Sequence, residues 1–173
     1  MASKTQLAFA RQVYAAAVEA KTEIDPAFVT AQAMLETGWG SRVIGKANLF
    51  GITKGSKWDG DIVMVKTHEY FKTPKQKFKE PDRIVSVCKV AGKNLWYYTV
   101  MRAFKDFDSV GDCLKEHERL FQKPGYKDAW PCRKDPFKFA QKICDGVGCK
   151  YATDPTYLTT ITSIIKTIRR KCV

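Results

Sequence analysis

The stretch Ala31–Gly40, AQAMLETGWG, carries a single carboxylate, Glu36, in an otherwise apolar segment that runs into a tryptophan flanked by glycines. Upstream of it, Asp25 is a typical helix N-cap and Pro26 suits the first helical position. Glycine commonly ends a helix, so the sequence predicts a helix that begins at Pro26 and ends near Gly38. Glu36 then lies at the C-terminal end of this helix.

On this helix, Glu36 is predicted to share a face with large apolar groups. Steps of three to four residues place the following residues on one side: Phe28, Gln32, Leu35, Glu36 and Trp39. Burial disfavours a charged carboxylate, and the negative end of the helix dipole adds to that effect. We therefore expect a raised pKa, which suits Glu36 to act as a catalytic general acid. The alternative is a surface glutamate at a fraying helix end.

The length and composition predict one soluble domain over residues 1–173. The chain has 173 residues, 45% of them hydrophobic, which is enough for a single buried core. It has no run near the roughly 18 apolar residues that suggest a membrane-spanning helix. The N-terminal segment, MASKTQLAFARQVYAAAVEA, mixes polar residues among its alanines, which predicts a helix and no signal peptide.

The chain is strongly basic. It has 30 lysines and arginines against 18 acidic residues, and its formal net charge is +12. This charge attracts polyanions, and nucleic acid, anionic lipid and an acidic cell-wall polymer all fit it. No motif for a recognition helix or a base-stacking sheet accompanies the basic residues, which are densest at 72–83 and 169–171. We therefore predict no nucleic-acid partner.

Six cysteines are numerous for a chain of this length. Cys144 and Cys149 are spaced to close a small loop through a disulfide, whereas buried free thiols are the alternative that the sequence leaves open. There is no CxxC pair, and His68 and His117 are the only histidines. The sequence therefore predicts no structural metal site.

The periodicity of apolar residues predicts helices, then a small sheet, then helices. Helical spacing covers residues 4–20 and, further on, residues 110–121. Two Asp-Pro pairs, at residues 135–136 and 154–155, are predicted to open the last two helices. Between the helical regions, three β-branched or aromatic runs predict antiparallel strands: Ile62–Val65, Ile84–Val90 and Leu95–Met101. The predicted fold class is α+β, with a mainly helical lobe and a β lobe at about 58–104 flanking a cleft.

A glycosidase would need a second carboxylate beside Glu36, and the predicted β lobe must supply it. The acids available there are Asp59, Asp61, Glu69, Glu80 and Asp82. Glu69 is the first choice, because it follows an extended apolar run and is bracketed by aromatic residues. The alternative is a strand residue paired with a nearby lysine.

Sugar rings stack on aromatic side chains, and five aromatics are candidates for this role: Trp39, Phe50, Trp58, Tyr70 and Tyr151. Packing in the core is the alternative for each, and it suits Phe50 best. Tyr151 lies in a polar run, which favours a surface position.

Four motifs occur in order along the chain: AQAMLETGWG at 31–40, NLFGI at 48–52, THEY at 67–70 and YATDPTY at 151–157. In order and spacing they resemble glycoside hydrolase family 73, which comprises peptidoglycan N-acetylglucosaminidases of bacteria and phages. The resemblance implies a lysozyme-like fold and a single catalytic domain. Phe71 and Lys72 stand where relatives often carry a further carboxylate, so the resemblance assigns the β-lobe role less firmly than that of Glu36.

The resemblance also implies roles for individual residues. Glu36 matches the general acid, Glu69 the β-lobe carboxylate, and Tyr151 a tyrosine that lines the substrate cleft. Asn48 and Tyr70 lie within matched motifs and are expected to contact substrate. No cofactor is implied.

The expected activity is endo-N-acetylglucosaminidase cleavage of peptidoglycan glycan strands by a monomer. The enzyme would act in the periplasm or cell wall, held by charge on an anionic cell-envelope surface. A phage-type lysin released by lysis fits a chain with no signal peptide, and a bacterial enzyme with a dedicated secretion route is the second option. A muramidase of the same fold and a basic, non-catalytic wall- or membrane-binding module are the alternatives.

Overall fold

The computed structural model describes residues 2–145, 151 and 154–173. The chain divides into a helical unit, formed by the residues up to Phe50 and those from Phe107 onward, and a β unit, Gly51–Asp106. The order of helices, small sheet and helices is the one predicted. The β unit is slightly wider than the predicted lobe, because the segments that lead into and out of the sheet pair with each other.

The helical unit contains five α-helices among the described residues: α1 (Lys4–Glu19), α2 (Pro26–Thr37), α3 (Val110–Phe121), α4 (Pro136–Asp145) and α5 (Tyr157–Lys171). Two short 3₁₀ turns, Pro124–Tyr126 and Trp130–Cys132, connect α3 to α4. The predicted bounds of α1, α2 and α3 are confirmed to within a residue or two. No helix in the described part of the chain has the length and apolar character needed to cross a bilayer.

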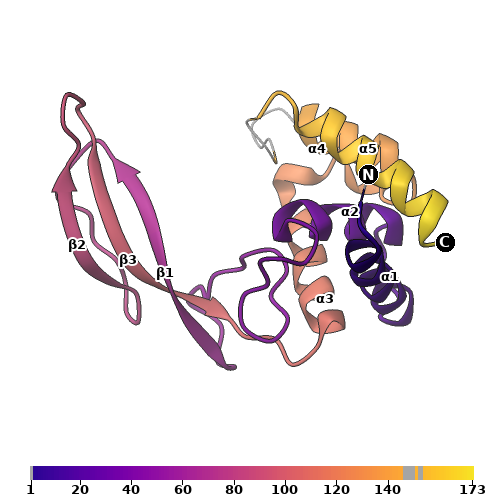
Figure 1. Ribbon diagram of the computed structural model, residues 1–173, viewed down its shortest axis with the longest axis horizontal. Coiled ribbons are helices and arrows are strands. Elements are labelled where there is room, and N and C mark those ends of the chain that lie inside the picture. The colour runs from indigo at the N-terminus through magenta and orange to yellow at the C-terminus, as the bar shows by residue number, and fades with distance from the viewer. Residues whose placement is uncertain (1, 146–150, 152–153) are drawn as a thin grey trace. The chain divides into compact units, whose positions relative to one another are not determined.

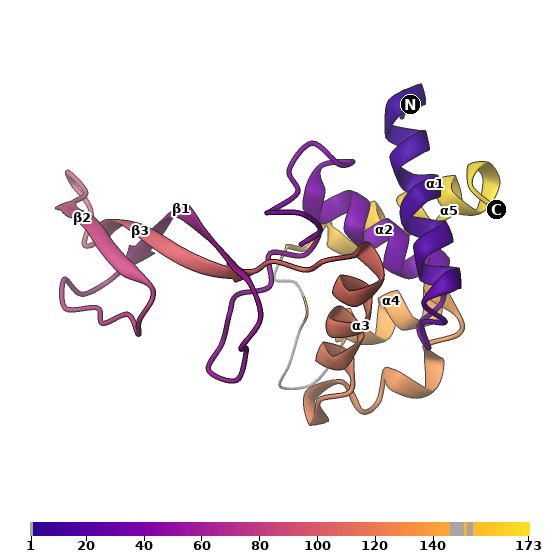
Figure 2. The ribbon, with the colours of Figure 1, turned by 90° about the horizontal axis from the view of Figure 1, so that it is seen from below.

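Helix α2 forms the centre of the helical unit. It packs on α1, α4 and α5, and Figure 2 shows α1 on one side of it and yellow α5 behind it. The carboxylate of Asp25 accepts hydrogen bonds from the backbone N–H groups of Ala27 (2.8 Å) and Phe28 (3.4 Å), which confirms the predicted N-cap. Phe28 is fully buried, with its ring edge-on to Phe139 at 4.8 Å. Because it is packed on nearly all sides, α2 is a firm support for the residues at its end.

The C-terminal end of α2 is closed by a run of three left-handed residues. Gly38, Trp39 and Gly40 have φ angles of 57°, 60° and 85°. The N–H of Gly38 donates to Leu35 O (3.3 Å) and that of Trp39 to Met34 O (2.7 Å), a Schellman arrangement. Trp39 adopts a conformation that costs a non-glycine residue about 1–2 kcal/mol, and the glycines on either side allow the chain to turn at once.

We expect Gly40→Ala to destabilise the fold by about 2–4 kcal/mol, from left-handed strain plus overpacking. A Cβ at Gly40 would lie 2.6 Å from Cδ1 of the Phe9 ring on α1, at a φ of +85°. Gly92→Ala is the matched control, because its φ is +68° and no atom lies within 4 Å of the added Cβ. Urea unfolding measures both variants, and equal losses would show that the contact with Phe9 contributes nothing.

The β unit contains a three-stranded antiparallel sheet of β1 (Ile62–Phe71), β2 (Arg83–Lys89) and β3 (Trp96–Lys105). The strand order is β1-β3-β2, and Figure 1 shows β3 in the middle. Strands β1 and β3 stay in register over their whole length, from Ile62 opposite Lys105 to Phe71 opposite Trp96. Both strands are therefore longer than predicted, because pairing continues through residues that carry no apolar pattern.

The pleat gives the sheet two different faces. Residues paired across antiparallel strands share a face, and neighbours along a strand point to opposite faces. Glu69 is opposite Tyr98, on the face that also carries Arg102, and we call this the carboxylate face. The other face carries His68, Tyr70 and Tyr97, and we call it the aromatic face.

The segment that follows β1 covers part of the carboxylate face, around Phe71 and Tyr98. Phe78 from this segment has its ring centroid 6.2 Å from that of Phe71 and 6.4 Å from that of Tyr98. Tyr98 is fully buried, and its hydroxyl accepts a hydrogen bond from the backbone N–H of Gln76 (3.3 Å). The β unit thus has a small core of its own on this face.

One predicted helix start is wrong by two residues. The carboxylate of Asp154 accepts from both the N–H and the hydroxyl of Thr156, each at 2.8 Å. These bonds close a turn over the Asp-Pro pair, so α5 begins only at Tyr157. The corresponding prediction for α4 is confirmed, because Asp135 caps the N–H groups of Phe137 and Lys138 at 3.1 Å.

The five cysteines that the structure describes are free thiols, but only Cys113 is buried as the alternative expected; the others are exposed or half-buried: Cys88, Cys132, Cys144 and Cys172. Cys113 is fully buried and accepts a hydrogen bond from the N–H of Leu49 (3.4 Å). Burial raises the pKa of its thiol to about 12, as expected for a thiol that packs as a small apolar group. Cys149, the proposed partner of Cys144, lies outside the described residues.

Candidate active site

Glu36 lies in the last turn of α2, with Tyr151 beside its carboxyl group. The hydroxyl of Tyr151 donates a hydrogen bond to Glu36 Oε1 at 3.4 Å. Desolvation raises the pKa of Glu36 and outweighs the Tyr151 hydrogen bond and the Arg42 charge, which both lower it. Although much of the residue is exposed, its carboxyl group is therefore partly removed from water, and the predicted direction of the shift is confirmed. The hydrogen bonds of Gly38 and Trp39 close the end of α2, which argues against a fraying helix end at Glu36.

Two tyrosines and a glutamine form a layer beside Glu36. Tyr151 stacks on Phe121, with ring centroids 5.5 Å apart, and its ring also lies 5.5 Å from that of Tyr157. The side-chain amide of Gln32, one helical turn before Glu36, donates to the hydroxyl of Tyr157 at 2.8 Å. Burial raises the pKa of both phenols, so each remains a hydrogen-bond donor at neutral pH.

The sequence did not assign a role to Gln32 or Tyr157. Gln32 is only 1% exposed on an otherwise apolar helix, and a buried amide needs a partner. Its position four residues before Glu36 was therefore a usable indication. Tyr157 closes the last matched motif, but the partner of its hydroxyl follows only from the packing of α5 on α2.

The predicted substrate contacts Asn48 and Phe50 lie in a packed segment. The ring of Phe50 stacks on that of His117, with centroids 3.7 Å apart, which agrees with the packing alternative. Asn48 is 1% exposed, and its backbone N–H and carbonyl pair with Ile44. Contact of the Asn48 side chain with a substrate would require this turn to open.

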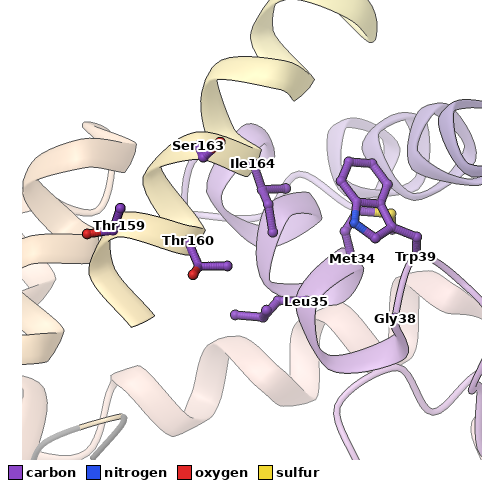
Figure 3. A pocket seen from close by; sticks show the side chains of 8 residues that line it. All are labelled: Met34, Leu35, Gly38, Trp39, Thr159, Thr160, Ser163 and Ile164. Atoms are coloured by element: carbon purple, nitrogen blue, oxygen red, sulfur yellow. The ribbon is translucent and has the colours of Figure 1, made fainter. Parts of the chain in front are cut away.

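A groove of about 510 Å³ lies between the end of α2 and α5, beside Trp39. Figure 3 shows the side chains that line it: Met34, Leu35, Gly38, Trp39, Thr159, Thr160, Ser163 and Ile164. None of these residues is charged. An indole and hydroxyl groups over an apolar floor suit an uncharged sugar residue, and the groove begins one residue from Glu36.

In the β unit, Glu69 forms an ion pair with Arg102 of β3. Arg102 Nε also lies 2.8 Å from Asp82 Oδ2, so one guanidinium holds two carboxylates. The second oxygen of Asp82 accepts from the backbone N–H of Ala103 at 2.7 Å. Glu69 is therefore paired with an arginine across the sheet, not with a nearby lysine. The sequence missed this role of Arg102, since nothing along the chain marks it.

The remaining candidates do not share the face of Glu69. Tyr70 is 61% exposed and points from the aromatic face, because it is the next residue along β1. The indole N–H of Trp58 donates to Asp61 O (2.9 Å), and the ammonium group of Lys105 lies 4.5 Å from the centre of its ring. Within the described ranges, no three His, Cys, Asp or Glu side chains gather in a way that could hold a metal ion.

Comparison with known proteins adds a family and a fold. Residues 12–170 match the family model Glucosaminidase, described as mannosyl-glycoprotein endo-beta-N-acetylglucosaminidase. Peptidoglycan hydrolase FlgJ of Vibrio parahaemolyticus is 32% identical over 141 residues, which are 78% of this chain and 37% of that protein. The protein named "Probable N-acetylmuramidase" in Lactococcus lactis subsp. cremoris is 31% identical over 143 residues, 81% of this chain and 28% of its own length. The chain thus spans about a third of the length of these curated relatives.

A solved glycoside hydrolase domain has the same fold. The structure of a C-terminally truncated glycoside hydrolase domain from Salmonella typhimurium FlgJ has a TM-score of 0.68 to this chain at 23% sequence identity. The match covers 95% of this chain and 98% of that one. The predicted α+β, lysozyme-like fold is confirmed.

Proposed function

Because its residues 12–170 match the glucosaminidase family, the chain belongs to that family of glycoside hydrolases, and we propose that it cleaves the glycan strands of peptidoglycan as an endo-N-acetylglucosaminidase. The observation that carries this proposal is Glu36, a carboxyl group with a raised pKa at the end of a buried helix. The curated FlgJ relative, named a peptidoglycan hydrolase, supports the choice of substrate.

Glu36 acts in this proposal as the general acid that protonates the glycosidic oxygen. Desolvation keeps a larger fraction of its carboxyl group protonated than an ordinary glutamate retains. Tyr151 holds Oε1, so we assign the proton that is transferred to Oε2. Because α2 is packed on α1, α4 and α5, the acid is fixed in position before the substrate arrives.

Glu69 supplies the second carboxylate in this proposal. Arg102, which also pairs with Asp82, holds its carboxylate in place. We assign it an electrostatic role: its charge stabilises the positive charge that develops on the sugar ring.

Glu69→Gln is expected to lower the rate of glycan hydrolysis by about tenfold or more, because it removes a charge that stabilises the transition state. Purified sacculi are the substrate, and the release of soluble fragments is measured. The matched controls are three exposed acids of the β unit: Asp59→Asn, Asp61→Asn and Glu80→Gln. A larger loss in one of these controls would move the second carboxylate to that position.

The bond that is cleaved can be identified from the new reducing end. Borohydride reduction of the digest is expected to convert N-acetylglucosamine, and not N-acetylmuramic acid, to its alcohol. Both reactions use the same acid, so the contacts made by the sugar decide the outcome. Reduced muramic acid would show that the chain is a muramidase, the activity in the name of the Lactococcus relative.

We also propose where the protein acts. A +12 chain is attracted to an anionic cell envelope, so we place the enzyme in the periplasm or cell wall as a monomer. A phage-type lysin is the context that we favour. A non-catalytic wall-binding module would bind sacculi without reducing their turbidity, and a membrane-disrupting protein would permeabilise vesicles that contain no peptidoglycan.

A further inference from the structure

The aromatic face of the sheet is open to solvent and carries three rings in mutual contact. The ring of Tyr97 stacks on His68, with centroids 5.1 Å apart and planes 12° from parallel. The Tyr70 ring lies at the same distance from Tyr97, tilted by 52°. Tyr70 is 61% exposed, so most of its side chain is open to solvent.

The strand register arranges this face in three rows across the sheet. One row is basic and contains Lys66, Met101 and Arg83; the next contains His68, Thr99 and Ser86; the third contains Tyr70, Tyr97 and Cys88. All nine residues are at least partly exposed, and none of them is acidic. Glu69 of β1 and Asp82, which precedes β2, both pair with Arg102 on the carboxylate face.

This combination points to a ligand with both ring faces and negative charge. Aromatic side chains stack on sugar rings, and the hydroxyl and imidazole groups of the middle row can hydrogen-bond to sugar hydroxyls. The basic row at one end attracts anions. A neutral sugar polymer would use only the rings, and a lipid surface would use only the charge. A single-stranded nucleic acid would use both, but no nucleic-acid-binding motif accompanies these residues in the sequence.

We propose that the aromatic face is a binding surface for an acidic glycan, the peptidoglycan polymer itself, separate from the carboxylate face that presents Glu69. This proposal rests on the proposed function for the identity of the polymer. Because adjacent residues of β1 point to opposite faces, Tyr70 and Glu69 cannot contact the same sugar residue through one face of the sheet. The surface thus holds the insoluble substrate, while Glu36 and Glu69 carry out the cleavage.

The test compares binding with cleavage. In a Glu36→Gln background, which leaves the polymer intact, Tyr70→Ala with Tyr97→Ala is expected to weaken binding to sacculi about tenfold, equivalent to about 1.4 kcal/mol. In the otherwise unchanged enzyme, the same pair is expected to change kcat/KM for a short soluble glycan by less than about twofold. Binding is measured by co-sedimentation, and folding by urea unfolding.

Two further variants give the controls. Val87→Ala removes a side chain that is 38% exposed on the other face of the same sheet, and it is expected to leave binding unchanged. Lys66→Ala with Arg83→Ala is expected to reduce the salt dependence of binding to sacculi. The tyrosine variants are also tested on anionic lipid vesicles, where we expect no change.

Several results would overturn the proposal. If the Tyr70→Ala, Tyr97→Ala double variant binds sacculi as tightly as its parent, the two rings bind no glycan. An equal loss of kcat/KM for the short glycan would place them in the catalytic site, and an equal loss of vesicle binding would show a lipid surface. If the wild-type protein cleaves no glycan but the double tyrosine variant still binds sacculi more weakly, the proposed hydrolase function is wrong. The aromatic face is then still a glycan-binding surface.

Discussion

Replacing Glu36 with Gln is expected to lower the rate of glycan hydrolysis by about a hundredfold or more, because general acid catalysis contributes roughly 10² to 10⁴. The amide keeps the shape of the carboxyl group and can still accept a hydrogen bond from Tyr151, so the fold is expected to stay intact. Release of soluble fragments from sacculi measures the activity, and urea unfolding measures the stability. Glu19→Gln, at the end of α1, is the matched control.

The pH profile gives a second readout of the same residue. The acid form of Glu36 is the active one, so the rate is expected to fall as the pH rises through its raised pKa. A residual activity of Glu36→Gln should lack this decline. If the variant keeps most of the wild-type rate, Glu36 is not the acid.

Acidification is expected to destabilise the protein through His117. The imidazole is 2% exposed, neither ring nitrogen has a hydrogen-bond partner among the residues that the structure describes, and burial lowers its pKa to about 3. The neutral form is thus favoured in the folded state, so the stabilisation is fully present above the unfolded pKa of about 6.5 and is lost as the pH falls towards 3. For this one group the loss between pH 7 and pH 4 is about 3 kcal/mol.

His117→Phe isolates this contribution. The variant keeps an aromatic ring against Phe50 and removes the proton-binding site, so its loss of stability between pH 7 and pH 4 should be smaller by about 3 kcal/mol. Urea unfolding at the two pH values measures the difference. His68→Phe is the control, since that imidazole is exposed on the sheet. A decline in His117→Phe parallel to that of the wild type would show that other groups cause the acid sensitivity.

The sequence predicted helix boundaries correctly where the capping residues lie within the helix or next to it. The start of α2 follows from Asp25 and Pro26, and its end from Gly38, because capping groups lie within a few residues of each other. The same Asp-Pro pattern misplaced the start of α5, since Asp154 satisfies its carboxylate within the turn. Strand length was underestimated, because the extent of β1 depends on its partner β3.

In the candidate site, the sequence predicted the direction of the pKa shift of Glu36, because that shift depends largely on the position of Glu36 on α2. Arg102 was missed because it meets Glu69 only across the sheet, 33 residues away along the chain. Glu69 and Tyr70 are neighbours in the sequence, and both were candidates for the site. The pleat separates them, and neither composition nor spacing shows which face of a strand meets the substrate.

The groups that support Glu36 lie far along the chain from it. Tyr151 is separated from Glu36 by 115 residues, and Tyr157 from Gln32 by 125 residues. During synthesis the ribosome makes the acid long before these partners, and α2 cannot bury its apolar sides until α5 exists. Glu36 therefore acquires its hydrogen-bond partner, and the buried layer beside it, only after nearly the whole chain has been synthesised.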